Sequence, residues 1–119
     1  MIASLLTAAI AALHLYILAL EMFRWEHPRT RRAFGTTEEF AKATKVLAAN
    51  QGLYNGFLAA GLLWAVIAGV GTDGRALAIF FLSCVLVAGL YGAATASRSI
   101  LFIQALPAAL ALVAVLARV

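Results

Sequence analysis

Four long stretches of this chain are almost free of formal charge, and they constrain its fold more than any other feature. They are Met1–Phe23, Val46–Gly71, Ala76–Ser97 and Ile100–Ala117. An α-helix rises ~1.5 Å per residue, so ~20 apolar residues cross the ~30 Å hydrocarbon layer of a membrane. Each stretch is about that long, and the sequence therefore predicts four transmembrane helices.

Composition argues against a soluble domain and against a membrane β-barrel. A soluble domain of this length needs polar outer faces and would carry about twice the 12 % of charged residues present here. Strands of a membrane barrel alternate in polarity over ~10 residues, which these stretches do not. The predicted fold class is all-α: a polytopic membrane protein, with one domain over residues 1–119 that forms an antiparallel four-helix bundle.

Basic side chains are concentrated in one connection. Six of the nine Lys and Arg lie between residues 24 and 45. In a four-span arrangement this loop and the 97–99 turn share one side of the membrane, whereas the other side holds Arg75 and Arg118. Because positively charged loops stay cytoplasmic, we expect both termini outside. Without a basic helix face interleaved with aromatics, nucleic acid is not an expected partner; the expected partners are the bilayer, a lipophilic small molecule and further copies of the chain.

Turn residues give the expected helix limits. Gly71 to Gly74 forms a tight turn, and Ser97 to Ser99 barely separates the last two helices, so consecutive helices are antiparallel neighbours. In the first loop, Thr36 and Glu39 have capping-box spacing, with Thr36 at the N-cap. The expected helices cover residues 2–23, 38–70, 76–97 and 100–117, with a cytoplasmic loop over 24–37.

Polar residues inside the predicted spans are the candidate functional residues, because each costs free energy unless it is paired or hydrated. Glu21 and His14, seven residues apart on one helical stripe, are the candidate catalytic residues. Candidate ligand-binding residues on the other helices are Asn50, Gln51, Tyr54, Asn55, Tyr91, Thr95, Arg98 and Gln104. Their spacing from the cytoplasmic basic residues predicts a polar pocket in the cytoplasmic leaflet.

Three functions fit this set. The favoured one is binding or transformation of a lipophilic small molecule, since a Glu, a His, two Tyr hydroxyls and several amides suit proton transfer or hydrogen-bonded capture. The alternatives are a small proton-coupled transporter and a structural or accessory subunit in which the amides join helices. Whether the protein is an enzyme stays open. Two His and one Cys without ligand spacing predict no metal site.

Four segments of the chain resemble a known bacterial family. They are His14–Phe23, Lys45–Leu62, Ala88–Thr95 and Gln104–Ala108. The family consists of small four-helix membrane proteins and is classed only as a domain of unknown function. The resemblance covers nearly the whole chain. It implies the four-helix fold and a location in the bacterial inner membrane, and it implies no activity.

Two more families are similar in single features. The long basic first loop and Asn50 near the start of the second helix resemble the membrane-associated eicosanoid and glutathione metabolism family, which implies glutathione as a ligand and a trimer. Leu47 and Leu53 lie where that family has Arg and Glu around its Asn, so no particular cofactor is predicted. The small multidrug resistance exporters are similar in length and in a single membrane Glu on the first helix, but their first loop is short.

Overall fold

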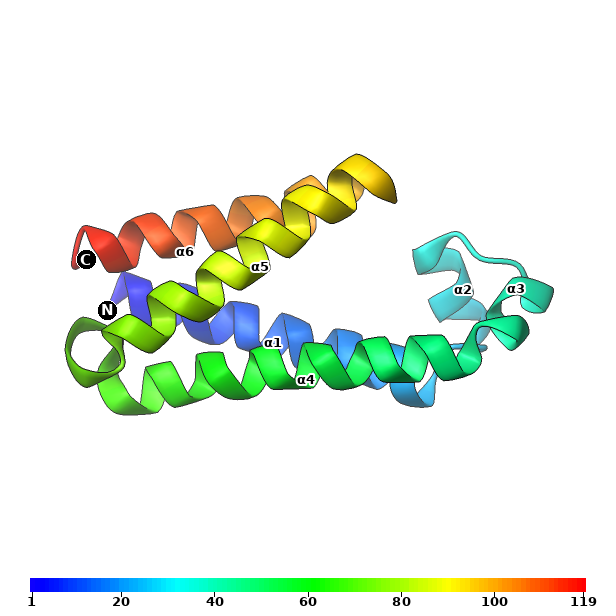
Figure 1. The fold of residues 1–119 in the computed structure, drawn as a ribbon, viewed down its shortest axis with the longest axis horizontal. Helices are drawn as coiled ribbons and strands as arrows, with labels where there is room; N and C mark the ends of the chain where they lie inside the picture. Colours follow the sequence, from blue (N-terminus) through cyan, green and yellow to red (C-terminus); the bar gives the residue numbers. More distant parts are fainter. The chain divides into compact units, whose positions relative to one another are not determined.

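The computed structural model describes all 119 residues, and its secondary structure is entirely helical (Figure 1). The long helices are α1 (Ile2–Phe23), α4 (Lys45–Ala68) and α5 (Arg75–Thr95). The shorter elements are α2 (Pro28–Phe34), α3 (Glu38–Ala43), the π-helical segments η1 (Gly69–Asp73) and η2 (Leu101–Ala105), and α6 (Leu106–Leu116). The prediction of an all-α chain is confirmed.

Three helical stretches are long and apolar enough to cross a membrane: Ile2–Phe23, Lys45–Asp73 and Arg75–Thr95. The fourth expected span is shorter, because only Leu101–Leu116 is helical. At ~1.5 Å per residue this stretch is about 24 Å long. Pro107 lies just after η2 and has no N–H to donate to the carbonyl four residues earlier. The missing hydrogen bond falls within η2, where the helix has π rather than α geometry.

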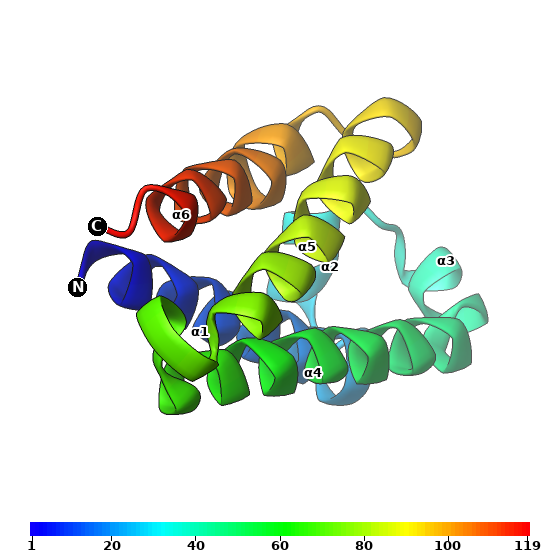
Figure 2. The same ribbon diagram turned by 60° about the vertical axis from the view of Figure 1, so that its left-hand side comes forward.

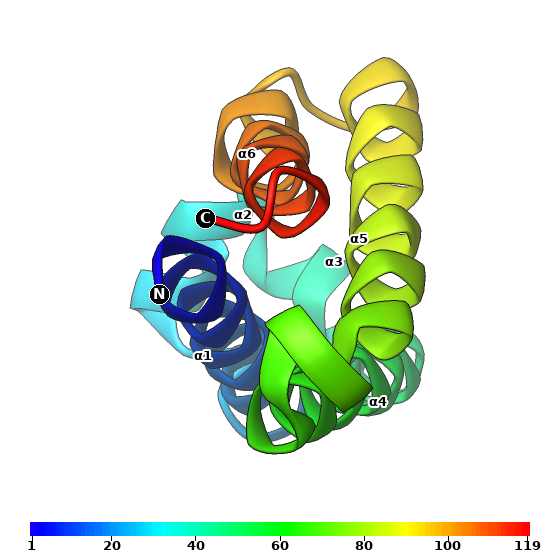
Figure 3. The same cartoon turned by 90° about the vertical axis from the view of Figure 1, so that its left-hand side faces the viewer.

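Contacts divide the chain into two compact units, and each is described by itself. Unit 1 comprises residues 1–12 and 58–119, and unit 2 comprises residues 13–57. In unit 1, α5 and α6 run antiparallel and side by side, joined by a short turn (Figures 2 and 3). Its core is apolar apart from Thr7, whose hydroxyl donates to the Ala3 carbonyl. The largest fully buried aliphatic side chains of the core are Leu62, Leu82, Val85 and Val115. Many of the remaining core positions are alanines, so the helices approach closely.

Gly89 lies where the backbone of α5 closely approaches the backbone of η2. A Cβ atom at this position of α5 would lie 2.7 Å from the backbone nitrogen of Ala105 and 2.9 Å from its Cα. Real Cβ atoms do not come that close to a backbone, so only glycine fits here. The contact places η2 directly against α5.

A short helix, α2, lies inside the segment that we expected to be a loop over 24–37 (Figure 1). Pro28 is its first residue, where the missing N–H costs nothing. The Nδ1 atom of His27 caps this end by accepting a hydrogen bond from the Arg29 N–H at 3.2 Å. Gly35, with φ of 68°, ends the helix in the left-handed conformation. The segment expected to be a loop therefore contains a helix that Pro28 begins and Gly35 ends.

The expected helix over 38–70 is divided at Thr44, which separates α3 from α4. The hydroxyl of Thr44 donates to the Phe40 carbonyl at 2.7 Å, a local bond that competes with regular helix geometry. The N-cap of α3 is Thr37, whose Oγ1 accepts from the Phe40 N–H at 3.1 Å. Our assignment of the cap to Thr36 is therefore wrong by one residue.

Candidate functional site

The interior of unit 2 differs from that of unit 1 because its buried side chains are mostly polar. His14, Glu21 and Thr30 are all buried, and the buried hydrophobic side chains of this unit are only Ala41 and Ala48. Buried polar groups in a small apolar chain are costly unless they are paired. Unit 2 is therefore where we look for a functional site.

Glu21 and Asn55 form the pair at the centre of unit 2. Asn55 Nδ2 on α4 donates a 2.7 Å hydrogen bond to Glu21 Oε1 on α1, and the Glu21 residue is 7 % exposed. The same Nδ2 group contacts the Gln51 carbonyl at 3.2 Å, which fixes the amide orientation. Both residues were predicted site residues, and the structure brings these two together.

Gly52 allows α4 to approach α1 at this pair. A Cβ atom on Gly52 would lie 2.7 Å from Met22 Cγ and 3.1 Å from Glu21 Cβ. Asn55 is three residues after Gly52, so at ~100° per residue both lie on the helix face that meets α1. A small residue at the closest point lets the amide reach the carboxyl directly.

Within unit 2, the second carboxyl oxygen of Glu21, Oε2, makes no hydrogen bond. It is also absent from the fully enclosed polar atoms that lack a partner, which are Thr30 Oγ1, Thr36 Oγ1 and Arg75 Nε. Oε2 is therefore still reachable from outside. A carboxyl with one oxygen held and one free can accept a hydrogen bond from a bound molecule or exchange a proton with it.

The remaining predicted residues of α4 do not join this pair. Asn50 is exposed, and its Nδ2 donates to the Val46 carbonyl of its own helix at 2.9 Å. Gln51 is exposed as well. Tyr54 is 61 % exposed and packs edge-on against Phe57 with ring centroids 6.0 Å apart. On α1, His14 is fully buried on the same stripe as Glu21.

Four more predicted residues lie in unit 1. Tyr91 is exposed and lines an apolar groove of about 550 Å³ along α5. Thr95 Oγ1 donates to the Tyr91 carbonyl at 2.7 Å, and Arg98 is exposed in the turn after α5. Gln104 is half-buried in η2. That these residues join Glu21 in one pocket stays a prediction.

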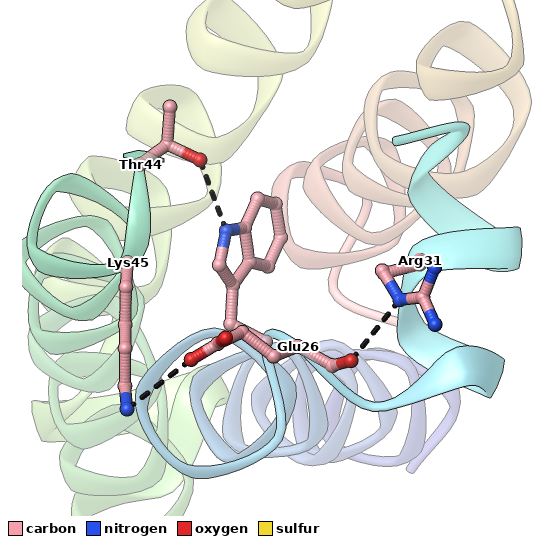
Figure 4. A network of polar contacts seen from close by, with 5 residues as sticks. Glu26, Arg31, Thr44 and Lys45 are labelled. Atoms are coloured by element: carbon pink, nitrogen blue, oxygen red, sulfur yellow. Dashed lines mark hydrogen bonds and ion pairs between the residues drawn. The ribbon is translucent and has the colours of Figure 1, made fainter. Parts of the chain in front are cut away.

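A cleft at the end of α1 was missed by the sequence analysis. It has a volume of about 300 Å³ and is lined by Met22, Phe23, Arg24, Trp25, Glu26, His27 and Lys45. We call it the Trp25 cleft. Figure 4 shows the polar contacts around it, in which Lys45 Nζ lies 3.2 Å from Glu26 Oε1 and Arg31 Nε donates to the Glu26 carbonyl at 3.1 Å. In the sequence, the basic residues on both sides of Trp25 were a signal for such a cleft. Whether these residues lie close together depends on α2 and on the helix break at Thr44.

Two contacts fix the position of Trp25. Its Nε1 donates to Thr44 Oγ1 at 3.1 Å, and its ring packs edge-on against Phe34 with centroids 5.0 Å apart. The indole thus connects the segment after α1 to α2 and to the start of α4. No group of three His, Cys, Asp or Glu side chains lies together in the structure as a metal site would require.

Comparison with known proteins gives the family. Residues 8–116 match a family described as a protein of unknown function, DUF1304. The chain belongs to this family. The resemblance to a family of unknown function is thereby confirmed. Among curated proteins, this DUF1304 chain is similar to the uncharacterized protein YpaA of Lactococcus lactis subsp. lactis strain IL1403, with 30 % identity over 111 residues and 92 % of each chain covered. No solved structure gives a significant match.

Proposed function

We propose that this DUF1304 protein is an integral protein of the bacterial inner membrane, with four spans and with α2 and α3 on the cytoplasmic side. Three long apolar helices support this proposal, as does the concentration of basic residues between 24 and 45. Large apolar side chains are exposed on each long helix, including Leu5, Ile67 and Val87, as contact with lipid requires. Because so short a chain encloses little interior, we also infer a homo-oligomer.

The topology predicts opposite results for two reporter positions. A reporter that is active only in the periplasm should work when fused after Val119 and fail when inserted at Gly35, because the basic loop stays in the cytoplasm. Each fusion is paired with a cytoplasmic reporter at the same position as its control. Periplasmic activity at Gly35 would contradict the orientation, and periplasmic activity at neither position would contradict the four-span arrangement.

We infer that the biochemical task of the protein is to bind or transform a lipophilic small molecule at Glu21. The observation that carries this function is the half-satisfied carboxyl: Oε1 is held by Asn55 at 2.7 Å, while Oε2 makes no hydrogen bond within unit 2. A carboxyl inside a membrane span is costly and is retained where it binds a ligand or moves a proton. Asn55 would orient the group, and Oε2 would meet the ligand.

Reactivity toward a membrane-soluble carbodiimide tests whether lipophilic molecules reach Glu21. Dicyclohexylcarbodiimide partitions into lipid and reacts with carboxyl groups there. We expect wild-type protein in native membranes to be modified at Glu21, as located by mass spectrometry of its peptides, and Glu21→Gln to lose this modification completely. Glu39→Gln is the matched control and should keep it, because Glu39 lies in α3, outside α1, and is exposed.

Ligand retention by the same two variants tests the function itself. Wild-type protein and Glu39→Gln, transferred from cell membranes into lipid nanodiscs, should carry a bound small molecule that native mass spectrometry detects. Glu21→Gln should have lost it while keeping its thermal unfolding temperature. If Glu21→Gln retains every molecule that the wild-type protein carries, the proposal is rejected. If no molecule is retained and Glu21→Gln unfolds more easily, Glu21 is a structural residue.

The structural alternative has an observation in its favour. Asn50 and Thr95 bond to carbonyls of their own helices, so these two polar side chains already have partners without any ligand. Asn55 and Glu21 also form an interhelical hydrogen bond of the kind that joins membrane helices. The free Oε2 atom is what favours a binding site over this alternative.

A further inference from the structure

The Trp25 cleft carries an inference that is separate from Glu21, which does not line it. The cleft follows the last turn of α1 and is bounded on the opposite side by Lys45, the first residue of α4. Under the proposed topology, this is the level of the lipid headgroups on the cytoplasmic side. The side chains that line it are of two kinds, cationic and apolar.

The cationic side chains of the lining offer hydrogen-bond donors that the fold does not use. Arg24 is exposed, and its guanidinium has no hydrogen bond or ion pair in the chain. Lys45 pairs with Glu26, but their side chains are 66 % and 40 % exposed, so the pair is weak and its ammonium keeps further donors. In His27, Nδ1 is occupied as an acceptor for the Arg29 N–H, which leaves Nε2–H as a donor.

Arg31 adds a guanidinium beside the cleft. Its Nε–H donates to the Glu26 carbonyl at 3.1 Å, so the side chain is held next to a cleft residue (Figure 4). The Nη groups make no hydrogen bond in the chain. Guanidinium groups bind phosphate through paired N–H donors, and this geometry suits a phosphate better than a single-point anion.

The apolar side chains of the lining are Met22, Phe23 and Trp25. The indole cannot turn freely, because Thr44 accepts its Nε1–H and Phe34 packs against its ring. A cleft lined both by cations and by a fixed aromatic ring matches a molecule with a charged head and an apolar chain.

We propose that the Trp25 cleft binds the phosphate group of an amphiphilic molecule, with Arg24, His27 and Lys45 as phosphate ligands and Trp25 against its apolar part. The phosphate could belong to a lipid headgroup or to a soluble phosphate monoester. The cleft chemistry is the same for both, and the experiment distinguishes them.

Quenching of Trp25 fluorescence tests this site. The chain has two tryptophans, and Trp64 is 62 % exposed, so Trp64→Phe leaves Trp25 as the only one without disturbing a buried contact. We place this full-length protein in phosphatidylcholine nanodiscs with increasing fractions of brominated phosphatidic acid or brominated phosphatidylcholine. Half-maximal quenching should need about a tenfold smaller fraction of brominated phosphatidic acid than of brominated phosphatidylcholine, because two cations favour the anionic headgroup. Arg24→Gln with Lys45→Gln should abolish this preference.

A second double variant controls for general surface charge. Arg32→Gln with Lys42→Gln removes the same charge from the same unit, but neither residue lines the cleft, so the preference should persist. Equal losses in the two double variants, with unchanged circular dichroism, would overturn the proposal, as would the absence of any preference. If glycerol 3-phosphate or inorganic phosphate relieves the quenching, the site takes a soluble phosphate compound. If neither does, the phosphate belongs to a lipid.

Discussion

Replacing Gly89 by leucine should leave no folded protein to purify in detergent. A Cβ atom at this position already lies 2.7 Å from the backbone nitrogen of Ala105, so a larger side chain forces α5 and η2 apart along their whole contact. Overpacking against a backbone cannot be relieved by a rotamer change, and we expect a loss of more than ~3 kcal/mol. Gel filtration and circular dichroism of the purified variant measure this loss.

Two alanine variants on α5 isolate the packing effect. Gly89→Ala and Gly92→Ala gain the same helix propensity, ~1 kcal/mol. At Gly92 the new Cβ meets only the flexible Ile100 side chain at 3.3 Å, whereas at Gly89 it meets main chain. We therefore expect Gly92→Ala to be neutral or stabilising and Gly89→Ala to be less stable by ~2–3 kcal/mol. Equal stabilities of the two variants would show that η2 does not pack against α5 in this way.

Asn55→Leu should destabilise the protein by ~2 kcal/mol or more, because it leaves Glu21 Oε1 buried without its donor. Asn50→Leu is the matched control on the same helix. Asn50 is exposed and bonds only to its own backbone, so its replacement should change stability by less than ~0.5 kcal/mol. Reversible unfolding in mixed detergent micelles compares the two variants.

A double variant tests whether the loss of stability comes from the hydrogen bond between Asn55 and Glu21. Glu21→Leu combined with Asn55→Leu removes both partners, so it should recover most of the stability that Asn55→Leu loses. Additive losses in the double variant would mean that the 2.7 Å contact contributes no coupling. Equal losses for Asn55→Leu and Asn50→Leu would mean that α4 turns a different face toward α1.

The apolar stretches could be read from the sequence because length and composition alone decide them. The first helix was expected over 2–23, and α1 has these limits, since the composition changes abruptly at Arg24. Local signals were less certain where one residue type has two roles. Proline both ends and begins helices, and the expected loop over 24–37 contains a helix that Pro28 begins.

Helical spacing also indicated which polar residues share a face, but it could not choose the face that meets α1. Asn50 and Asn55 are five residues apart, so they point about 140° away from each other, and only one of them can contact Glu21. The choice of Asn55 follows from the close approach at Gly52.

The sequence by itself determined the helical class, the three long apolar helices and the identity of the one acidic residue within them, because these depend on neighbouring residues along one chain. Only the tertiary structure decided the partner of Glu21, the free state of its Oε2 atom and the Trp25 cleft. Each of these depends on side chains from different helices that come within about 3 Å, and a periodicity along one helix carries no information about the distance to another.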